Sequence, residues 1–67
     1  MSKLPMKALR AAKNLTQREV AEKLGINRMT YASWEKYERY PNAMQLIQLS
    51  EIFECSLDAF YFPKKAS

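Results

Sequence analysis

Histidine is absent from this chain, and cysteine and glycine each occur once among its 67 residues. A single cysteine excludes a disulfide framework within the chain. Together these absences exclude zinc sites of the usual Cys/His kind. Catalysis by Ser–His or Cys–His pairs, and acid–base chemistry at histidine, are excluded as well. The inventory therefore predicts a protein that is not an enzyme and that uses no metal and no cofactor.

Long apolar runs are also missing. No stretch approaches the roughly 18 apolar residues needed to span a bilayer, and residues 1–5 lack the apolar core of a signal peptide. We therefore expect a cytoplasmic protein without membrane contact. A length of 67 residues allows one small domain, which we expect over residues 1–67, with its core at about 5–62 and a frayed tail at 63–67.

Positive charge is unevenly distributed. Residues 1–41 carry nine basic and four acidic side chains, whereas residues 42–67 carry two basic and three acidic ones. A basic half beside a nearly neutral half indicates one face for a polyanion and another for packing or self-association. Ordinary surface charge is the alternative interpretation.

Helical periodicity marks five segments, at about 5–13, 16–25, 27–36, 42–54 and 57–62. No sustained two-residue alternation indicates a strand. The fold class predicted is therefore all-α, a bundle of five helices.

Short signals place the helix ends. Pro5 suits a first helical position, and Asn14 suits a left-handed exit. Thr16 and Glu19 have the spacing of a capping box. The only glycine, Gly25, fits a sharp turn with positive φ. Asn27 is expected to be the N-cap of the next helix, and the helix after that is expected to start at Asn42.

The helical spacing also predicts the core. Ala21 must be small because two helices cross closely there, and Thr30 is expected to pack against it, with a phosphate contact as the alternative. The other expected core positions are Met6, Leu9, Ala12, Val20, Leu24, Tyr31, Trp34, Ala43, Leu46, Ile47, Leu49, Ser50, Phe53, Leu57, Phe60 and Tyr61.

Residues 25–27 join two short helices by a turn of three residues, which is a helix-turn-helix arrangement. Residues 15–28 resemble the Leu-Thr-Gln-x-x-hydrophobic-Ala-x-x-hydrophobic-Gly-hydrophobic-Ser/Asn pattern of the Cro/C1-type (XRE) helix-turn-helix family. The Trp-Glu pair at 34–35, Pro41 and the Leu-Asp pair at 57–58 also resemble features of that family. The resemblance covers roughly residues 6–61.

The resemblance implies a lambda-repressor-like bundle whose third helix enters the major groove of double-stranded DNA. Side chains near the N-terminus of such a helix meet base edges. Arg28 suits a bidentate contact to guanine, and Met29 suits a thymine methyl group. A solvated Arg28 and a protein-binding Met29 are the alternatives. The expected base-contacting residues are Arg28, Met29, Ala32 and Ser33.

Phosphate contacts are expected on both sides of this helix. By resemblance, Gln17 anchors a backbone phosphate at the start of its helix, and a solvated polar residue is the alternative. Tyr37 and Tyr40 are expected to contact phosphate, with a purely structural role as the alternative. Many family members have glycine at the position of Tyr37. Because a bulky residue tolerates positive φ poorly, we expect this loop to take another conformation. The phosphate set is Gln17, Arg18, Lys36, Tyr37, Arg39 and Tyr40.

Other residues are assigned to structure and assembly. In some family members an arginine of the first helix pairs with the glutamate that Glu35 matches, so Arg10 and Glu35 are expected to form a structural ion pair. Trp34 is expected in the core, with an indole contact to phosphate as the alternative. Cys55 is interpreted as a small buried hydrophobe. The expected dimer surface comprises Ile52, Cys55, Ser56, Ala59 and Phe62.

These features predict a sequence-specific DNA-binding transcriptional regulator that acts as a homodimer on an inverted repeat and represses by blocking polymerase. Such a protein would be associated with the nucleoid when bound to DNA. The alternative is an antitoxin or adaptor on the same fold whose main partner is a protein.

Overall fold

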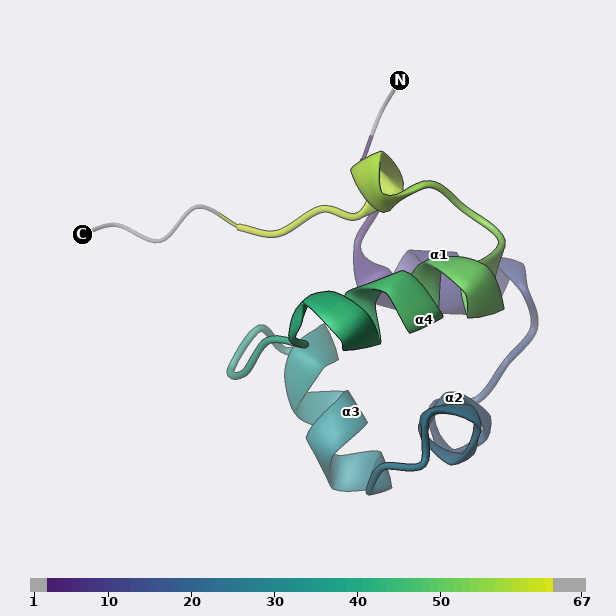
Figure 1. Ribbon diagram of the computed structural model, residues 1–67, viewed down its shortest axis with the longest axis vertical. Coiled ribbons are helices and arrows are strands. Elements are labelled where there is room, and N and C mark those ends of the chain that lie inside the picture. Colours follow the sequence, from purple (N-terminus) through teal and green to yellow (C-terminus); the bar gives the residue numbers. More distant parts are fainter. Residues whose placement is uncertain (1–2, 64–67) are drawn as a thin grey trace.

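The structure is a computed structural model that describes residues 3–63. It comprises four α-helices and one 3₁₀ turn. Figure 1 shows α1 and α4 in the upper half of the view, with α2 and α3 below them. The elements in chain order are α1 (Met6–Ala12), α2 (Gln17–Leu24), α3 (Arg28–Glu35), α4 (Ala43–Phe53) and η1 (Leu57–Ala59).

Side-chain caps begin three of the helices. The Thr16 hydroxyl accepts a hydrogen bond from the backbone N–H of Glu19, whose carboxylate accepts one from the backbone N–H of Thr16. Asn42 and Gln45 form the same reciprocal pair at α4, and Asn27 caps α3. These side chains satisfy N–H groups that have no partner inside the helix. The predicted starts at Thr16, Asn27 and Asn42 are confirmed.

A left-handed residue lies at the end of each of the four helices, and at α3 this residue is Tyr37. Asn14 has φ 58° and Gly25 has φ 70°, as the sequence predicts. Glu54 ends α4 with φ 54°, although it is not a residue type that favours this region. Pro5 differs from the expectation, because it is the N-cap of α1 and not its first helical residue.

Nine apolar side chains meet in one core. Each of the four α-helices contributes two of them, and Phe60 after η1 contributes the ninth. Tyr31 is fully buried and lies edge-on to Trp34, with ring centroids 5.9 Å apart. Trp34 is 2% exposed, which makes it a core residue. The face of α3 that carries Tyr31 and Trp34 packs in the core, and the opposite face is on the surface. The buried set is Met6, Leu9, Val20, Ala21, Tyr31, Trp34, Leu49, Phe53 and Phe60.

The expectation of a fifth helix is wrong. Only the 3₁₀ turn forms, and Phe60 then takes an extended conformation that forms an isolated parallel bridge with Leu4. The backbone N–H of Leu4 donates to Ala59 O and that of Tyr61 donates to Leu4 O, both at 2.9 Å. These hydrogen bonds replace helical ones, and the extended backbone carries the Phe60 ring into the core.

Several expected core positions are exposed. Ile47 lies on the outward side of α4 and is 41% exposed, because only the side that bears Leu49 and Phe53 meets the core. Leu57 and Tyr61 are exposed by 49% and 44% after the chain leaves helical geometry. The positions for which the prediction is wrong are Ala12, Ala43, Ile47, Leu57 and Tyr61.

The expected dimer surface is partly used inside the domain. Ile52, Cys55, Ala59 and Phe62 are half-buried and pack against the core, whereas Ser56 is exposed. Burial raises the pKa of the Cys55 thiol, which disfavours the reactive thiolate. Of the expected tail, residues 64–67 lie outside the described part of the chain.

Two further features bear on the class of protein. No helix between residues 3 and 63 is long and apolar enough to cross a membrane. The same residues include no group of three or more His, Cys, Asp or Glu side chains arranged to hold a metal ion.

We predict that Ala21→Leu destabilises the domain, because Ala21 is 2% exposed where α2 packs against α3. Overpacking a core position costs about 1–3 kcal/mol, which for a domain of this size lowers Tm by roughly 5–20 °C. Thermal unfolding followed by circular dichroism measures this. Ala11→Leu, at an exposed position of α1, is the control. Equal Tm values for the two variants would contradict the placement of Ala21.

Candidate nucleic-acid interface

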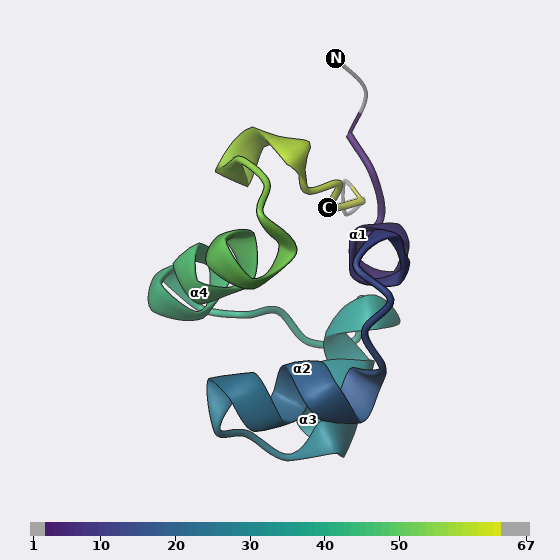
Figure 2. The ribbon, with the colours of Figure 1, turned by 90° about the vertical axis from the view of Figure 1, so that its right-hand side faces the viewer.

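Helices α2 and α3 cross and are joined by a tight turn (Figure 2), and Arg28 and Met29 at the start of α3 are exposed. The turn is closed by the backbone N–H of Ile26, which donates to Ala21 O at 3.0 Å. Gly25 supplies the left-handed residue that this geometry requires. Two short helices joined in this way, with an exposed face on the second, define a helix-turn-helix unit.

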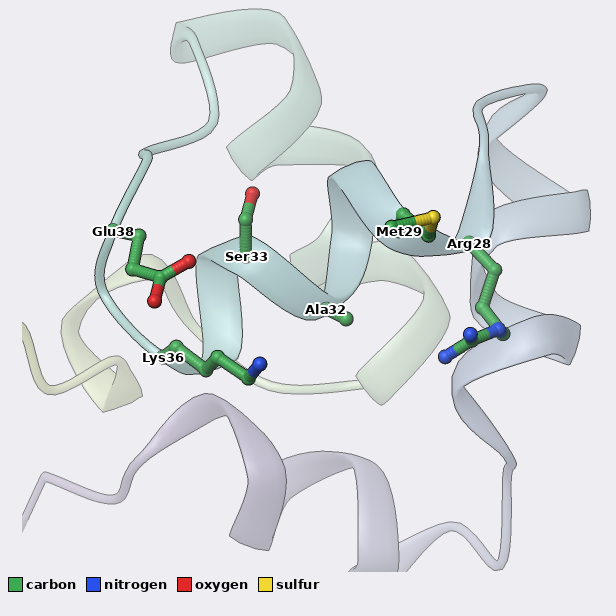
Figure 3. A pocket seen from close by; sticks show the side chains of 6 residues that line it. All are labelled: Arg28, Met29, Ala32, Ser33, Lys36 and Glu38. Atoms are coloured by element: carbon green, nitrogen blue, oxygen red, sulfur yellow. The ribbon is translucent and has the colours of Figure 1, made fainter.

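The outer face of α3 carries all four expected base-contacting residues. Arg28, Met29, Ala32 and Ser33 line one shallow concavity together with two further charged residues, Lys36 and Glu38 (Figure 3). Met29 is 72% exposed, while Ala32 and Ser33 are half-buried. We name the surface formed by these six residues the groove face.

Ser33 presents only part of its hydrogen-bonding capacity to the outside. Its hydroxyl donates to the backbone carbonyl of Thr30 at 2.6 Å. A hydroxyl has one proton and two lone pairs. On the groove face, Ser33 therefore offers an acceptor rather than a donor.

An ion pair joins α1 to the last residue of α3. Arg10 Nε donates to Glu35 Oε2 at 2.6 Å, and Arg10 Nη2 donates to Glu35 Oε1 at 3.3 Å. The two side chains are 15% and 5% exposed, so water screens the pair little. Arg10 Nη1 also donates to the carbonyl of Leu15 at 2.8 Å, which ties in the turn before α2.

Two more hydrogen bonds extend from this ion pair to the groove face. Gln17 Nε2 donates to Glu35 Oε1 at 2.9 Å, and Gln17 Oε1 accepts a hydrogen bond from Arg28 Nη1 at 3.3 Å. Gln17 is half-buried at the first turn of α2, and Arg28 is the first residue of α3. The start of α2 and both ends of α3 are thus held in one continuous network.

Electrostatics keep Glu35 ionised in this network. Burial raises the pKa of its carboxyl, but Arg10, the neighbouring Tyr31 hydroxyl and Gln17 together outweigh burial and leave the pKa below its ordinary value of 4.5. Burial, and after it the neighbouring Glu35 carboxylate, raise the pKa of Tyr31. The Tyr31 hydroxyl is buried, and among residues 3–63 it has no hydrogen-bond partner within the usual distance and angle limits.

The loop after α3 differs from the sequence expectation. Tyr37 has φ 59°, so it takes the left-handed conformation in spite of its side chain. Such a residue costs roughly 1–2 kcal/mol. The Tyr37 hydroxyl donates to Tyr61 O at 3.0 Å, and its ring contacts those of Tyr40, Tyr61 and Phe62. These contacts hold the strained conformation that glycine provides without strain in many family members.

Of the expected phosphate-contacting residues, Lys36 lies on the groove face itself. Arg18, Lys36 and Arg39 are exposed, whereas Gln17 and Tyr37 already donate hydrogen bonds within the protein. Tyr40 is 37% exposed, and its ring also contacts Phe62.

Sequence reasoning missed Glu38 as part of this face. In the loop from Tyr37 to Pro41, the sequence predicts roles only for the basic and phenolic side chains, and Glu38 contributes to that prediction only through the net charge. One sequence signal does indicate this placement of Glu38. It directly follows the position where many family members have glycine, and a left-handed residue at that position turns the chain back against the preceding helix.

Comparisons with known proteins agree with this geometry. A profile described as helix-turn-helix matches residues 6–60. The uncharacterized HTH-type transcriptional regulator YqaE of Bacillus subtilis is 43% identical over 53 residues, which cover 79% of this chain and 46% of that protein. The HTH-type transcriptional activator BcrR of Enterococcus faecalis is 38% identical over 53 residues, covering 79% of this chain and 26% of that protein. This chain thus spans less than half the length of either relative.

The chain belongs to the Cro/C1-type (XRE) helix-turn-helix family. Both relatives are named as transcriptional regulators.

We predict that Glu35→Gln unfolds more easily than the unchanged protein at pH 7, and that this difference shrinks in acid. A carboxyl whose pKa is lowered by folding stabilises the protein above its ordinary pKa of 4.5, and the stabilisation is lost as pH falls through the lowered value. Urea unfolding at several pH values between 7 and about 3 measures the difference.

The matched control for this prediction is Glu51→Gln, which removes an exposed carboxylate on α4. Its free energy of unfolding at pH 7 is expected to stay within about 0.5 kcal/mol of the unchanged protein. A difference between Glu35→Gln and the unchanged protein that stays constant down to pH 3 would contradict the role given to the ion pair.

Proposed function

We propose that this chain is a sequence-specific double-stranded DNA-binding domain of a transcriptional regulator, and that it reads the major groove with α3. The observation that carries this proposal is the groove face. Four residues expected to meet bases lie together on the outer side of a helix whose inner side is committed to the core. A single α-helix fits the major groove, and residues near its N-terminus reach base edges there.

Arg28 is the residue proposed to contribute most to base discrimination. It stands at the first position of α3, and its guanidinium already donates one hydrogen bond to Gln17. A guanidinium held from one side loses less conformational entropy when its remaining N–H groups meet guanine O6 and N7. Met29, exposed beside it, would contact a thymine methyl group.

Phosphates are proposed to meet the basic side chains on this face and around it. Arg18, Lys36 and Arg39 are exposed at the two ends of α3 and at the start of α2. Gln17 lies in the first turn of α2, where unpaired backbone N–H groups favour an anion. These contacts would set the position of the domain on DNA without reading sequence.

A homodimer on an inverted repeat is the proposed working form, because one such domain contacts few bases. Two copies of α3 would read half-sites about 34 Å apart on one face of the duplex. The C-terminal residues around Ser56 form the proposed contact between the copies, where the neighbouring Leu57 is 49% exposed. Repression is the proposed outcome, since occupying a promoter needs no contact with polymerase.

A second candidate function is an antitoxin or adaptor whose main partner is a protein. The outward side of α4 favours it, because Met44 and Ile47 are 66% and 41% exposed. Exposed apolar anchors of this kind are typical of protein-binding surfaces. The charged and polar groove face favours the DNA-binding function.

Selection from a random duplex pool at about 150 mM salt tests the proposal. We expect enrichment of an inverted repeat with half-sites about one helical turn apart. Arg28→Ala should lose about 1–3 kcal/mol of discrimination at one base pair in each half-site. Lys7→Ala, which removes an exposed cation of α1, is the control. If nothing is enriched, or if Arg28→Ala keeps the full preference, the proposed reading by α3 is wrong.

The salt dependence of binding gives a separate prediction. A dimer that makes about six to eight phosphate contacts should lose affinity with a slope of log K against log salt of roughly −5 to −7. Arg18→Ala should weaken binding to all sequences about equally, because a phosphate contact carries no base preference. Gln17→Ala should in addition reduce the preference at the base pair read by Arg28, because Gln17 accepts a hydrogen bond from the Arg28 guanidinium. Fluorescence anisotropy with the selected duplex and a scrambled one measures both. A slope near zero would contradict binding through phosphates.

A further inference from the structure

Glu38 is an acidic residue on a surface that is otherwise suited to a polyanion. It lines the same concavity as Arg28, Met29 and Ser33, and Figure 3 shows its carboxylate pointing toward the concavity next to α3. A second, adjoining hollow is lined by Met29, Ser33, Arg39 and Glu38 as well. Glu38 therefore lines both hollows, together with Met29 and Ser33 of α3.

The backbone fixes this position. The left-handed Tyr37 reverses the chain after α3. The backbone N–H groups of Glu38 and Arg39 then donate to the same carbonyl, Ser33 O, at 3.0 and 3.3 Å. The Cα of Glu38 is thus held against the last turn of α3 rather than on a free loop. Its place on the groove face is built by the strained residue before it.

The carboxylate itself is available for an outside partner. Glu38 is exposed, and within residues 3–63 its side chain forms no hydrogen bond and no ion pair. Lys36 lines the same concavity without pairing with it. The hydroxyl of Ser33 donates to Thr30 O, so it too offers only lone pairs outward. Glu38 and Ser33 together form a small patch of hydrogen-bond acceptors, and Arg28 lies at the opposite end of the concavity (Figure 3).

A patch of acceptors selects its partner by chemistry. Phosphate oxygens and the acceptor atoms of guanine and thymine are repelled by a carboxylate. The major-groove donors are the exocyclic amino groups of cytosine and adenine. Adenine presents its N7 acceptor beside that amino group, whereas cytosine presents the amino group without one. A carboxylate with a neighbouring hydroxyl acceptor therefore fits cytosine better.

We infer that Glu38 is a specificity-determining residue that accepts a hydrogen bond from the amino group of a cytosine in each half-site. This inference rests on the proposed DNA-binding function and adds to it a contact outside the expected base-contacting set. The carboxylate lowers affinity for non-specific DNA because it repels phosphates. In exchange it raises sequence specificity, because it also repels bases that present an acceptor at the position next to Glu38.

Parallel duplex selections with the unchanged protein, Glu38→Gln, Glu38→Ala and the control Glu51→Gln test this inference. Glu51→Gln removes one negative charge from α4, outside the groove face. Affinities are then measured for selected duplexes in which single base pairs are exchanged. We expect the unchanged protein and the control to prefer cytosine about tenfold at one position distinct from that read by Arg28. Both Glu38 variants should lose most of that preference and keep the preference that depends on Arg28.

Three outcomes would overturn the inference. Glu38→Ala and Glu38→Gln would bind every duplex more tightly without a change of preference if Glu38 only repelled phosphates. A preference for cytosine that persists in both variants would assign the contact to another residue. A lost preference for a base other than cytosine would exclude the proposed chemistry. If the unchanged protein enriches no sequence at all, the proposed function fails and this inference fails with it. If it enriches an inverted repeat without a cytosine preference that depends on Glu38, this inference alone fails.

Discussion

The hydrogen-bonded ion pair between Arg10 and Glu35 is the constraint on which the placement of the groove face depends. Glu35 is the last residue of α3, and Arg10 binds it from α1 while also bonding the carbonyl of Leu15 before α2. Removal of either partner would leave a largely buried charge without compensation. The pair therefore sets where α3 ends relative to the other helices, while the buried Tyr31 and Trp34 set which side of it faces inward.

The same carboxylate links structure to recognition. Glu35 accepts a hydrogen bond from Gln17, and Gln17 accepts one from Arg28. Gln17, proposed to contact phosphate, and Arg28, proposed to contact a base, are thus held in place by the Glu35 carboxylate that also stabilises the bundle. This arrangement reduces the entropy that the two side chains would lose on binding. It also means that a variant of Glu35 changes recognition as well as stability, and the two effects need separate measurements.

Local signals made much of the fold predictable. The starts of α2, α3 and α4 follow from capping side chains, and the end of α2 follows from Gly25, because these interactions lie within a few residues of each other. The grouping of the four residues proposed to contact bases on one side of α3 follows from helical spacing once α3 is placed. What could not be predicted depends on distant segments. Phe60 leaves helical geometry to pair with Leu4, and Ile47 is exposed because nothing in the described chain covers that side of α4.

Tyr37 illustrates the same limit. Steric rules disfavour it in a left-handed conformation, and that reasoning is sound for an isolated turn. Aromatic rings that come from the far end of the sequence outweigh the local cost. The sequence pattern around Tyr37 does not contain this information, and so the position of Glu38 was also missed.

The bridge between Leu4 and Phe60 has a consequence for folding kinetics. It joins segments from the two ends of the described chain, whereas the caps, the turn after α2 and the packing of α2 on α3 are local. Contacts between distant segments form late, because the chain must first be ordered between them. We therefore expect the terminal segments to open and exchange amide hydrogens while the helix-turn-helix unit remains folded. In such a partly open state, the hydrogen bond from the Tyr37 hydroxyl to Tyr61 O would be broken. The loop that carries Glu38 would then lose its fixed conformation before α3 unfolds.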